Sequence, residues 1–481
     1  MEHVCRRMRP SVGLRVVMLV ALVGVACGQS IPGLEGPFVA NVTDSSAVIW
    51  WGGPTAAAGR VDIGEWTARG EQAPYELLVP DLQPNTQYSY SLTLDSGVRL
   101  PAEGTYTFKT APRPGGSDEF AFAILSDSRG SEPAEPVNAQ ALSALLGDAK
   151  ARGARFVCFP GDMVFGYCRD EETYREQMRA WKAVAAPLMH EMPVYTTMGN
   201  HDVLVHLARD RFGEYDLDGV GQGGEELYGE EVFSSEFVNP PNGPKLPEKP
   251  GAPSYRETCF SFDFGNAHFV FLNTNYWAAT RVYPYLPGDP CRLYEVGNPE
   301  GRVMERQINW LGSDLKRARA AASEHLFVFA HEPAFPVSHH IDDAMYYWGN
   351  ATASLKQDVR RRRDRFWSLL SQYGVLAAFF GDEHNYSRSL IGASGSAEYD
   401  PAVWHVITGG AGAPPSAEFH PHVPWSDAVR AFHSRNHYCL VKVRGRRVAL
   451  EVWALPEAEW PGDDDLQTEL IDRVRDLTIR D

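Results

Sequence analysis

The stretch Val194-Tyr195-Thr196-Thr197-Met198-Gly199-Asn200-His201-Asp202 combines a short strand-like run with a polar turn. Residues 194–197 are typical of a buried strand, because β-branched and aromatic side chains dominate them. Gly199 removes a Cβ where the backbone must change direction. The next three side chains, Asn200, His201 and Asp202, can bind a cation or move a proton. This stretch therefore predicts a strand that ends in a chemically active loop.

Four other expected strands end in residues of the same kind. These strands are residues 120–125, 156–159, 326–330 and 375–380. The polar residues that follow them are Asp127, Gly161-Asp162, His331 and Gly381-Asp382-Glu383-His384. In an open α/β sheet, ligands bind beyond the carboxyl ends of the strands, so these loops can converge. Each of them alone could be an ordinary turn, but the succession predicts one functional site.

Helix-like segments separate these strands. The expected helices are residues 136–152, 171–188, 305–321 and 358–373. Alternating strands and helices predict a layered α/β domain, which we place at residues 118–455. Residues 203–257 interrupt the alternation and indicate a surface insertion. The acidic C-terminal tail is placed at residues 456–481, and we expect residues 462–481 to form a frayed helix.

Before this domain, residues 37–111 predict an all-β unit of short strands and turns. The run Leu82-Gln83-Pro84-Asn85-Thr86-Gln87-Tyr88 resembles the tyrosine corner of a fibronectin type III sandwich. An unrelated strand-rich cap is the alternative, and a β-sandwich is predicted in either case. Residues 111–116 have the composition of a linker.

Composition limits the possible functions. The chain has 481 residues, and 62 Asp and Glu against 45 Lys and Arg give a net charge of −17. General nucleic-acid binding draws on clustered basic residues, so the charge argues against it. No long apolar run follows the N-terminus, and no internal membrane span is expected.

The N-terminus predicts a signal peptide at residues 1–26. Four arginines, at positions 6, 7, 9 and 15, precede the apolar run 16–26. A secretory cut before Cys27 fits, and so does a lipoprotein cut that would leave Cys27 to carry a lipid anchor. A short uncut membrane anchor is a third interpretation. We therefore expect a secreted, periplasmic or outer-surface protein.

The seven cysteines show no C-x-x-C spacing, so a thiolate zinc site is not expected. Cys158 lies within an expected strand and is interpreted as a core residue. Cys168 and Cys291 lie in loop-like sequence, and an oxidising compartment would permit them to pair.

The order of the motifs resembles the calcineurin-like metallophosphoesterases, in particular the branch that includes purple acid phosphatases with an N-terminal fibronectin-like domain. The family pattern is Asp-x-His, Gly-Asp, Gly-Asn-His-Asp/Glu, a lone His and Gly-His-x-His. Here these places hold Asp127-Ser128-Arg129, Gly161-Asp162, Gly199-Asn200-His201-Asp202, His331 and Gly381-Asp382-Glu383-His384. The resemblance spans about residues 120–453. It implies a four-layer α/β/β/α sandwich preceded by a small all-β sandwich.

The resemblance also implies a pair of metal ions, either Fe, Mn or Zn, with Asp162 as the bridge between them. It places Asp127 and His384 on one ion, and it places Asn200, His331 and Asp382 on the other. Two cations roughly 3.5–4 Å apart clamp a phosphoryl group and turn a bound water into hydroxide, which attacks phosphorus. His201 is implied as the proton donor to the leaving oxygen. Asp202 either holds the His201 imidazole or points into solvent.

Two places depart from the family pattern. Arg129 stands where the family usually has His, and a guanidinium cannot bind a metal because it stays protonated. Either the first ion has fewer ligands and binds weakly, or Arg129 clamps the substrate phosphate, which is the interpretation we favour. Asp382 replaces a second His, and this carboxylate shifts the preference toward harder metals.

The leading hypothesis is an exported phosphoesterase that acts on small phosphomonoesters or phosphodiesters. The alternatives are a catalytically weakened metal-binding surface or adhesion module and a hydrolase with a single ion. Three aromatic groups could line a substrate pocket or serve only in packing: His339-His340, Tyr346-Tyr347-Trp348 and Tyr167. Gly409-Gly410-Ala411-Gly412 is interpreted as a turn near the site, because no lysine or helix follows it.

Overall fold

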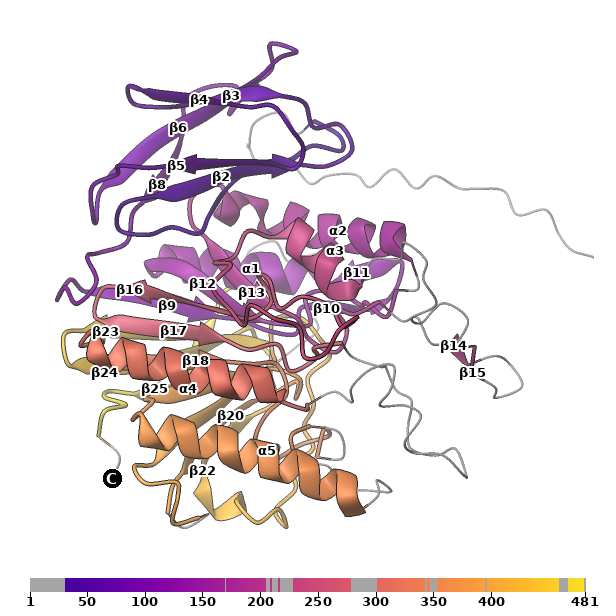
Figure 1. Cartoon of the computed structure of the whole chain (residues 1–481), viewed down its shortest axis with the longest axis vertical. Coiled ribbons are helices and arrows are strands. Elements are labelled where there is room, and N and C mark those ends of the chain that lie inside the picture. Colours follow the sequence, from indigo (N-terminus) through magenta and orange to yellow (C-terminus); the bar gives the residue numbers. More distant parts are fainter. Residues whose placement is uncertain are drawn as a thin grey trace, which may run out of the picture.

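The computed structural model describes residues 31–168, 170–204, 208–209, 215–216, 228–277, 301–341, 344–346, 353–393, 396–457 and 466–479. In Figure 1 an all-β part lies at one end of a layered α/β part. Within the described ranges, no helix is both long and apolar enough to cross a bilayer. The predicted signal peptide and Cys27 lie outside these ranges, and so does Cys291.

The N-terminal part consists of two antiparallel sheets. One sheet has the order β1 (Glu35–Ala40), β2 (Ala47–Gly52), β5 (Tyr75–Val79). The other contains β4 (Trp66–Gly70), β3 (Gly59–Ile63), β6 (Gln87–Leu94), β7 (Arg99–Leu100) and β8 (Tyr106–Lys109), which also pairs with β6. Their apolar faces meet around Trp51, Val61 and Tyr90. The hydroxyl of Tyr88 accepts a hydrogen bond from the Gln83 backbone at 2.7 Å, as a tyrosine corner requires. The predicted all-β region is confirmed.

The α/β part contains two large sheets. The first has the order β13 (Val194–Thr197), β12 (Ala154–Pro160), β9 (Phe120–Ile124), β23 (His437–Arg444), β24 (Arg447–Ala454), β25 (Glu469–Val474). The second has the order β16 (Phe260–Phe264), β17 (Ala267–Phe271), β18 (His325–Phe329), β19 (Ala377–Phe380), β21 (Val403–Thr408), β20 (Tyr386–Ile391), β22 (Val429–His433). Aromatic side chains such as Phe122, Phe156 and Phe269 pack between the two sheets.

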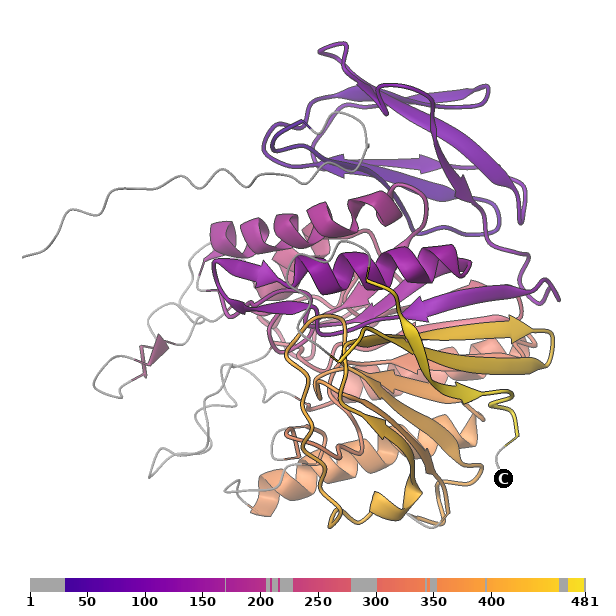
Figure 2. The ribbon, with the colours of Figure 1, turned by 180° about the vertical axis from the view of Figure 1, so that it is seen from behind.

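Helices cover the outer faces of both sheets, which gives four layers (Figures 1 and 2). Helices α1 (Ala139–Ala151) and α2 (Glu171–Met189) pack on the first sheet, and α3 (Gly229–Glu236) lies against α2. Helices α4 (Glu305–Ala320) and α5 (Ala353–Gln372) cover the second sheet. The predicted α/β/β/α fold with its all-β extension is confirmed.

Parallel pairing explains why the loops named above can meet. Strands β9, β12 and β13 run parallel in the first sheet, and β17, β18, β19 and β21 do so in the second. These strands are buried on both faces, so their sequences are almost continuously apolar. Their carboxyl ends therefore lie at one edge of each sheet.

The prediction of a frayed helix at the C-terminus is wrong for residues 469–474. They form β25, which pairs antiparallel with β24 in register Leu450↔Val474. Without this strand, β24 would be an open edge with unpaired backbone groups. Two small hairpins complete the described elements: β10 (Arg129–Glu132) with β11 (Glu135–Val137), and β14 (Ala208–Arg209) with β15 (Tyr215–Asp216). A single 3₁₀ turn, Ser426–Ala428, precedes β22.

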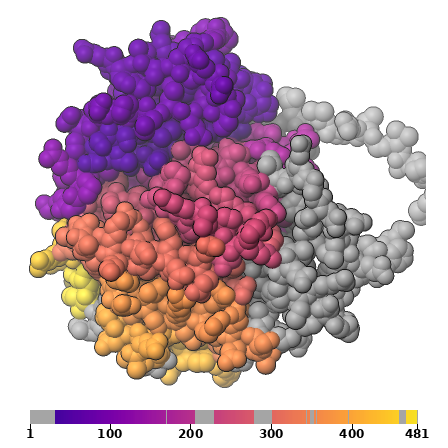
Figure 3. Space-filling view, in the orientation of Figure 1, coloured from indigo at the N-terminus to yellow at the C-terminus, as the bar shows by residue number. Residues whose placement is uncertain are grey.

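The all-β part is anchored on α2 through apolar and charged contacts, and Figure 3 shows it as one end of a continuous surface. Phe38 and Trp50 belong to the same core cluster as the residues of α1 and α2. The ammonium of Lys182, which is 1% exposed, contacts the carboxylates of Glu35 and Glu236. Arg175 contacts Glu236 as well. We call Glu35, Arg175, Lys182 and Glu236 the Lys182 cluster.

Candidate metal centre

The three predicted aspartate ligands lie in tight turns directly after their strands. Asp127, Asp162 and Asp382 have φ angles of 62°, 53° and 68°, which is left-handed backbone that non-glycine residues rarely adopt. This backbone folds the chain back at the strand end. The neighbouring glycines leave the space that the carboxylates use. A Cβ on Gly199 would lie 2.2 Å from Asp162 Oδ1, and one on Gly381 would lie 2.5 Å from Asp127 Oδ2.

His331 lies at the centre of the site and joins the two sheets. Its Nε2 atom is 3.2 Å from Asp162 Oδ1 and 3.8 Å from Asp382 Oδ1. Its Nδ1 atom lies 2.8 Å from the Pro160 carbonyl, to which it donates, so Nε2 can face the carboxylates as a ligand. Possible ligand atoms of Asp127, Asp162 and His331 all lie within 4.8 Å of one another. The three residues are fully buried or nearly so.

Asn200 completes this half of the site. One end of its side-chain amide lies 3.1 Å from His331 Nε2, and the other end is hydrogen-bonded to the Tyr167 hydroxyl at 2.8 Å; turned with its oxygen inward, the amide faces the site as a ligand. The atoms that converge here are carboxylate oxygens, an amide oxygen and an imidazole nitrogen. All of them are electron-pair donors to a cation. The residues therefore fit a metal ion, because each of them can offer an electron pair to the same cation.

His384 and Asp127 face each other on the other side of the site. His384 Nε2 is 3.8 Å from Asp127 Oδ1, and His384 Nδ1 donates to the Pro414 carbonyl at 3.1 Å. Burial and then the charge of Arg129 lower the pKa of His384 well below its usual value, so its imidazole is neutral. The Asp382 backbone N–H donates to both carboxylate oxygens of Asp127 at 3.1 Å. This pair also fits a cation.

The carboxylates of the site perturb one another. Burial raises the pKa of Asp127 to about 6, and the Asp162 charge adds to the rise against the opposing effect of His331. Burial also acts on Asp162, but His331 and His201 overcome it and lower the pKa of that carboxyl. Such opposite shifts in neighbouring acids are typical of functional sites.

Arg129 is the first residue of β10 and lies beside the site. Its Nε atom is buried, and within the described ranges the side chain makes no hydrogen bond or ion pair. Its charge contributes to lowering the pKa of Asp127, His201 and His384, which places the guanidinium near all three. A half-buried guanidinium without an internal partner is able to receive an external anion.

His201 is held in place by hydrogen bonds to Asp162 and Phe165. Its backbone N–H donates to Asp162 Oδ1 at 2.9 Å, and its Nδ1 atom donates to the Phe165 carbonyl at 2.5 Å. The free Nε2 atom lies 3.9 Å from Asp162 Oδ2. Burial lowers the pKa of His201 to about 4, against the attraction of Asp162 and with the help of Arg129. In the free protein the imidazole is therefore neutral at pH 7.

Asp202 does neither of the two things expected of it. Its side chain is fully buried, so it does not point into solvent. Its carboxylate accepts hydrogen bonds from the backbone of Met163 at 3.1 Å and of Gly199 at 3.0 Å, and it does not reach the His201 imidazole. Burial, together with repulsion from Asp162, raises its pKa to about 8. Asp202 turns inward because the buried backbone N–H groups of Met163 and Gly199 need a hydrogen-bond acceptor.

The structure brings further residues to the site that had only weak signals in the sequence. His340 Nε2 is 3.5 Å from Asp382 Oδ1, and the His339 ring lies 5.0 Å from that of His384. Glu383, which sequence reasoning missed, is buried and accepts hydrogen bonds from Val337 and Ser338, so it fixes the loop before these histidines. In the sequence, the indication that Glu383 belongs to the site was its position between the predicted ligands Asp382 and His384.

Of the remaining aromatic candidates, Tyr167 lies at the site and Tyr346 packs in the core under α5. The Tyr167 ring packs on that of His201 at 4.3 Å. Tyr346 instead packs edge-on against Trp425 at 4.6 Å. Tyr347 and Trp348 lie outside the described residues. The glycine turn is close to the site as predicted, because a Cβ on Gly409 would lie 2.9 Å from Asp127 Oδ2. Cys158 is fully buried in the core.

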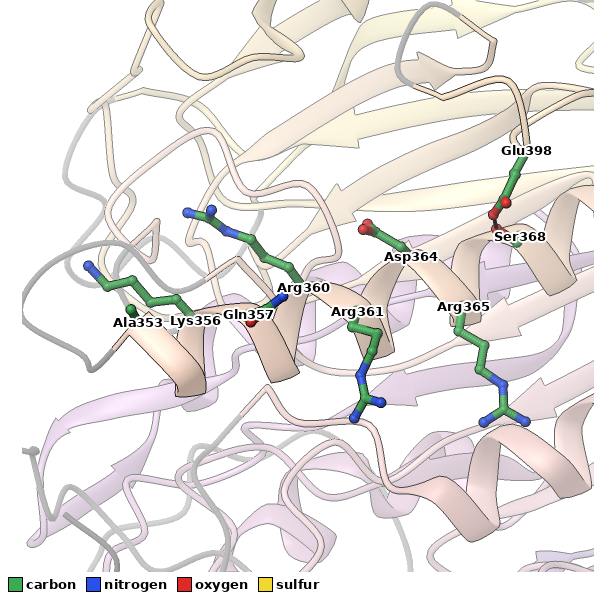
Figure 4. Close-up of a pocket in the computed structure, with 9 residues that line it drawn as sticks. All are labelled: Ala353, Lys356, Gln357, Arg360, Arg361, Asp364, Arg365, Ser368 and Glu398. Atoms are coloured by element: carbon green, nitrogen blue, oxygen red, sulfur yellow. Dashed lines mark hydrogen bonds between the residues drawn. The ribbon is translucent and has the colours of Figure 1, made fainter.

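A hollow of about 700 Å³ lies along α5, lined by residues of that helix and Glu398, none of which is a predicted ligand. Figure 4 shows that its charged side chains diverge: Arg360 and Asp364 point to one side of the helix, and Arg361 and Arg365 to the other. Arg361 is paired with Asp358 at 2.6 Å, and Arg365 is paired with Glu305. The charges are thus largely neutralised and do not converge on one ligand.

Comparison with known proteins identifies the class. Residues 120–386, more than half of the chain, match the model of the calcineurin-like phosphoesterase family. The chain therefore belongs to this family, and the prediction of a hydrolase acting on phosphoric ester bonds is confirmed. No curated protein matches the sequence closely enough to count as a relative.

Two solved structures share the fold over nearly the whole chain. A purple acid phosphatase, PPD1, from yellow lupin (Lupinus luteus) seeds is 16% identical, with a TM-score of 0.60, over 91% of this chain and 73% of that one. A structure of PhoD is 15% identical, with a TM-score of 0.62, over 93% of this chain and 90% of that one. At these identities the likeness concerns the fold.

Proposed function

We propose that this protein is an exported metal-dependent phosphoesterase that hydrolyses small phosphomonoesters or phosphodiesters. The observation that carries the proposal is the convergence of buried electron-pair donors from five loops beside Arg129, which is unpaired among the described residues. Asp162 would bridge two ions, with Asp127 and His384 on one. Asn200, His331 and Asp382 would hold the other. Fe, Mn or Zn suits this mixture of carboxylate, amide and imidazole ligands.

The ions, when bound, supply positive charge at the phosphoryl group and lower the pKa of a water molecule. The protein's own residues orient the substrate. Arg129 would bind two phosphoryl oxygens with its fork of N–H donors, since among the described residues no acceptor competes for it. Burial within the layered fold excludes bulk water from the ligand atoms, which strengthens each of these interactions.

His201 is the proposed proton donor to the leaving oxygen. Its Nδ1 atom is engaged by the Phe165 carbonyl, so only Nε2 can exchange a proton with a substrate. In the free protein the pKa of His201 is low, so a bound substrate must raise it before His201 can donate a proton. The negative charge of a bound phosphoester acts in that direction. Asp202 supports the same loop through the backbone of Met163 and Gly199.

Export is proposed from the arginine-rich start and the apolar run of residues 16–26. Cys27 would then be the first residue of the mature chain, either free or carrying a lipid anchor. We also propose a fibronectin type III-like identity for the N-terminal sheets, supported by the Tyr88 corner. A small phosphoester is the proposed partner, and general nucleic-acid binding is not expected of so acidic a chain.

The test combines metal analysis with a turnover assay. The purified protein is expected to contain close to two metal ions and to hydrolyse an aryl phosphate or a bis-aryl phosphate. One ion with turnover would indicate the single-ion hydrolase. A protein without metal and without turnover, even after incubation with Mn²⁺, Fe²⁺ or Zn²⁺, would contradict the proposal and favour a binding module.

A further inference from the structure

The segment Phe165-Gly166-Tyr167 wraps around Asn200 and His201 through three hydrogen bonds. His201 Nδ1 donates to the Phe165 carbonyl at 2.5 Å, and the Tyr167 N–H donates to the His201 carbonyl at 3.1 Å. The outer end of the Asn200 amide is hydrogen-bonded to the Tyr167 hydroxyl at 2.8 Å. The Tyr167 ring also packs on the His201 ring. We call residues 165–167 the clasp.

The backbone of the clasp can be this close only in an unusual conformation. Gly166 has φ +70°, and a Cβ there would lie 1.7 Å from the His201 carbonyl oxygen. Tyr167 has φ +48°, which costs free energy for a residue other than glycine. The buried side chain of Gln177 accepts from the Gly166 N–H at 2.8 Å and holds the turn from α2. Neighbouring elements thus maintain a strained turn, as is common at functional sites.

The side-chain amide of Asn200 has two orientations, and only one suits a metal ion. With its oxygen inward, Oδ1 faces His331 and Asp162, and the amide nitrogen points outward to Tyr167. With the amide turned over, its nitrogen would donate to Asp162 and His331 at 3.1–3.2 Å, and its oxygen would accept from Tyr167. The second orientation withdraws Asn200 from metal binding.

We propose that Tyr167 is a positioning residue that stabilises the metal-binding orientation of Asn200. In that orientation the buried Nδ2 group needs an acceptor, and the Tyr167 hydroxyl is the acceptor present. Without it, a buried donor would be unpaired, which is unfavourable. A buried carbonyl oxygen without a partner is tolerated better. Loss of the hydroxyl therefore favours the orientation that cannot bind metal.

This inference rests on the proposed metal-dependent function, and the test separates the two. The protein is stripped of metal with a chelator and titrated with Mn²⁺ by calorimetry, as wild type and as Tyr167→Phe. The variant keeps the ring against His201 and removes only the hydroxyl. We expect the Kd of the Mn²⁺ step that involves Asn200 to rise about tenfold, in the range that partners of metal ligands typically show. The other step should not change.

Two control variants assign the effect. Tyr399→Phe removes a hydroxyl that donates to Asp364 at 2.8 Å on the α5 side and should bind Mn²⁺ like wild type. Asp127→Asn should weaken the other step and so identify it. Unchanged binding by Tyr167→Phe, or equal weakening of both steps, would overturn the role of Tyr167. Absence of Mn²⁺ binding by the wild type would instead overturn the metal-dependent function itself.

Discussion

The Lys182 cluster and the metal centre are both buried groups of charged residues, but they differ in how their charges are balanced. In the Lys182 cluster, two carboxylates meet the ammonium of Lys182, and Arg175 adds a second cation. Burial acts on Glu236, but these cations overcome it and hold its pKa below the usual value. The cluster is complete within the chain.

In the metal centre, by contrast, the negative charges outnumber the positive charges that pair with them. Three aspartates lie around His331, and burial and Asp162 raise the pKa of Asp127 to about 6. The nearby cation, Arg129, pairs with none of these carboxylates. Buried charge is tolerated when it is paired or binds a metal. The comparison teaches that a structural charge cluster neutralises itself, whereas a functional one keeps positions for an external cation and an external anion.

The largest effect is expected from the bridging ligand of the metal centre. Asp162→Asn should lower kcat for an aryl phosphate at least about a thousandfold, which corresponds to about 4 kcal/mol in the barrier. The reason is that an amide cannot bridge two cations with two charged oxygens. Steady-state kinetics and metal analysis measure the change, and circular dichroism verifies the fold. Full activity in a folded variant would refute the two-metal interpretation.

The corresponding change in the Lys182 cluster should affect stability and leave chemistry alone. Lys182→Met leaves Glu35 and Glu236 less well paired and should lower the free energy of unfolding by about 3–5 kcal/mol. Urea unfolding measures this change. Lys150→Met is the matched control, because its pair with Glu191 is about 40% exposed and should contribute less than about 1 kcal/mol.

A loss of metal by Lys182→Met at a temperature where the variant is folded would contradict the distinction between the two clusters. The same outcome would show that the all-β part and α2 influence the ligand geometry.

The free arginine should have an intermediate effect. Arg129→Gln removes a charge-assisted clamp on the phosphoryl group and should lower kcat/KM about 10- to 100-fold, mainly through KM. Arg129→Lys should fall in between, since it keeps the charge and loses the fork. If Arg129→Gln instead binds the ion of Asp127 and His384 more tightly and keeps its kcat/KM, the only effect of Arg129 is to weaken the binding of that ion.

The smallest effect is a pH dependence of stability in the Lys182 cluster. Glu236 has a lowered pKa, so its contribution is fully present above the unfolded pKa of about 4.5 and is lost as pH falls through the lower folded pKa. The difference in unfolding free energy between wild type and Glu236→Gln, about 1 kcal/mol or more at pH 7, should therefore shrink below pH 4.5. A difference that stays constant from pH 7 to pH 3.5 would mean that Glu236 stabilises through packing.

Much of the site could be predicted from the strand ends. The apolar runs that precede Asp127, Asp162 and His331 predict parallel strands, and parallel strands bring their carboxyl ends together. What the sequence pattern could not supply was the function of Asp202. It lies next to His201 in the chain, but its carboxylate binds backbone amides of two different loops. Only the folded positions of Met163 and Gly199 reveal that role.

The C-terminal strand and the His339-His340 pair likewise depend on contacts that the local sequence pattern does not predict. Glu469–Val474 has no strong strand pattern, and it becomes a strand because β24 offers an edge to pair with. His340 reaches Asp382 because Glu383 holds the preceding loop. These interactions join segments distant in sequence, which local periodicity does not encode.

The sequence by itself determined the layered fold, the family and the set of metal-capable residues, because hydrophobic periodicity and residue chemistry are local properties. Tertiary structure alone decided which of these residues face one another, that Arg129 has no partner among the described residues, and that Tyr167 contacts Asn200. The physical reason is that pairing, burial and orientation depend on distances between segments, and those distances exist only once the two sheets have packed together.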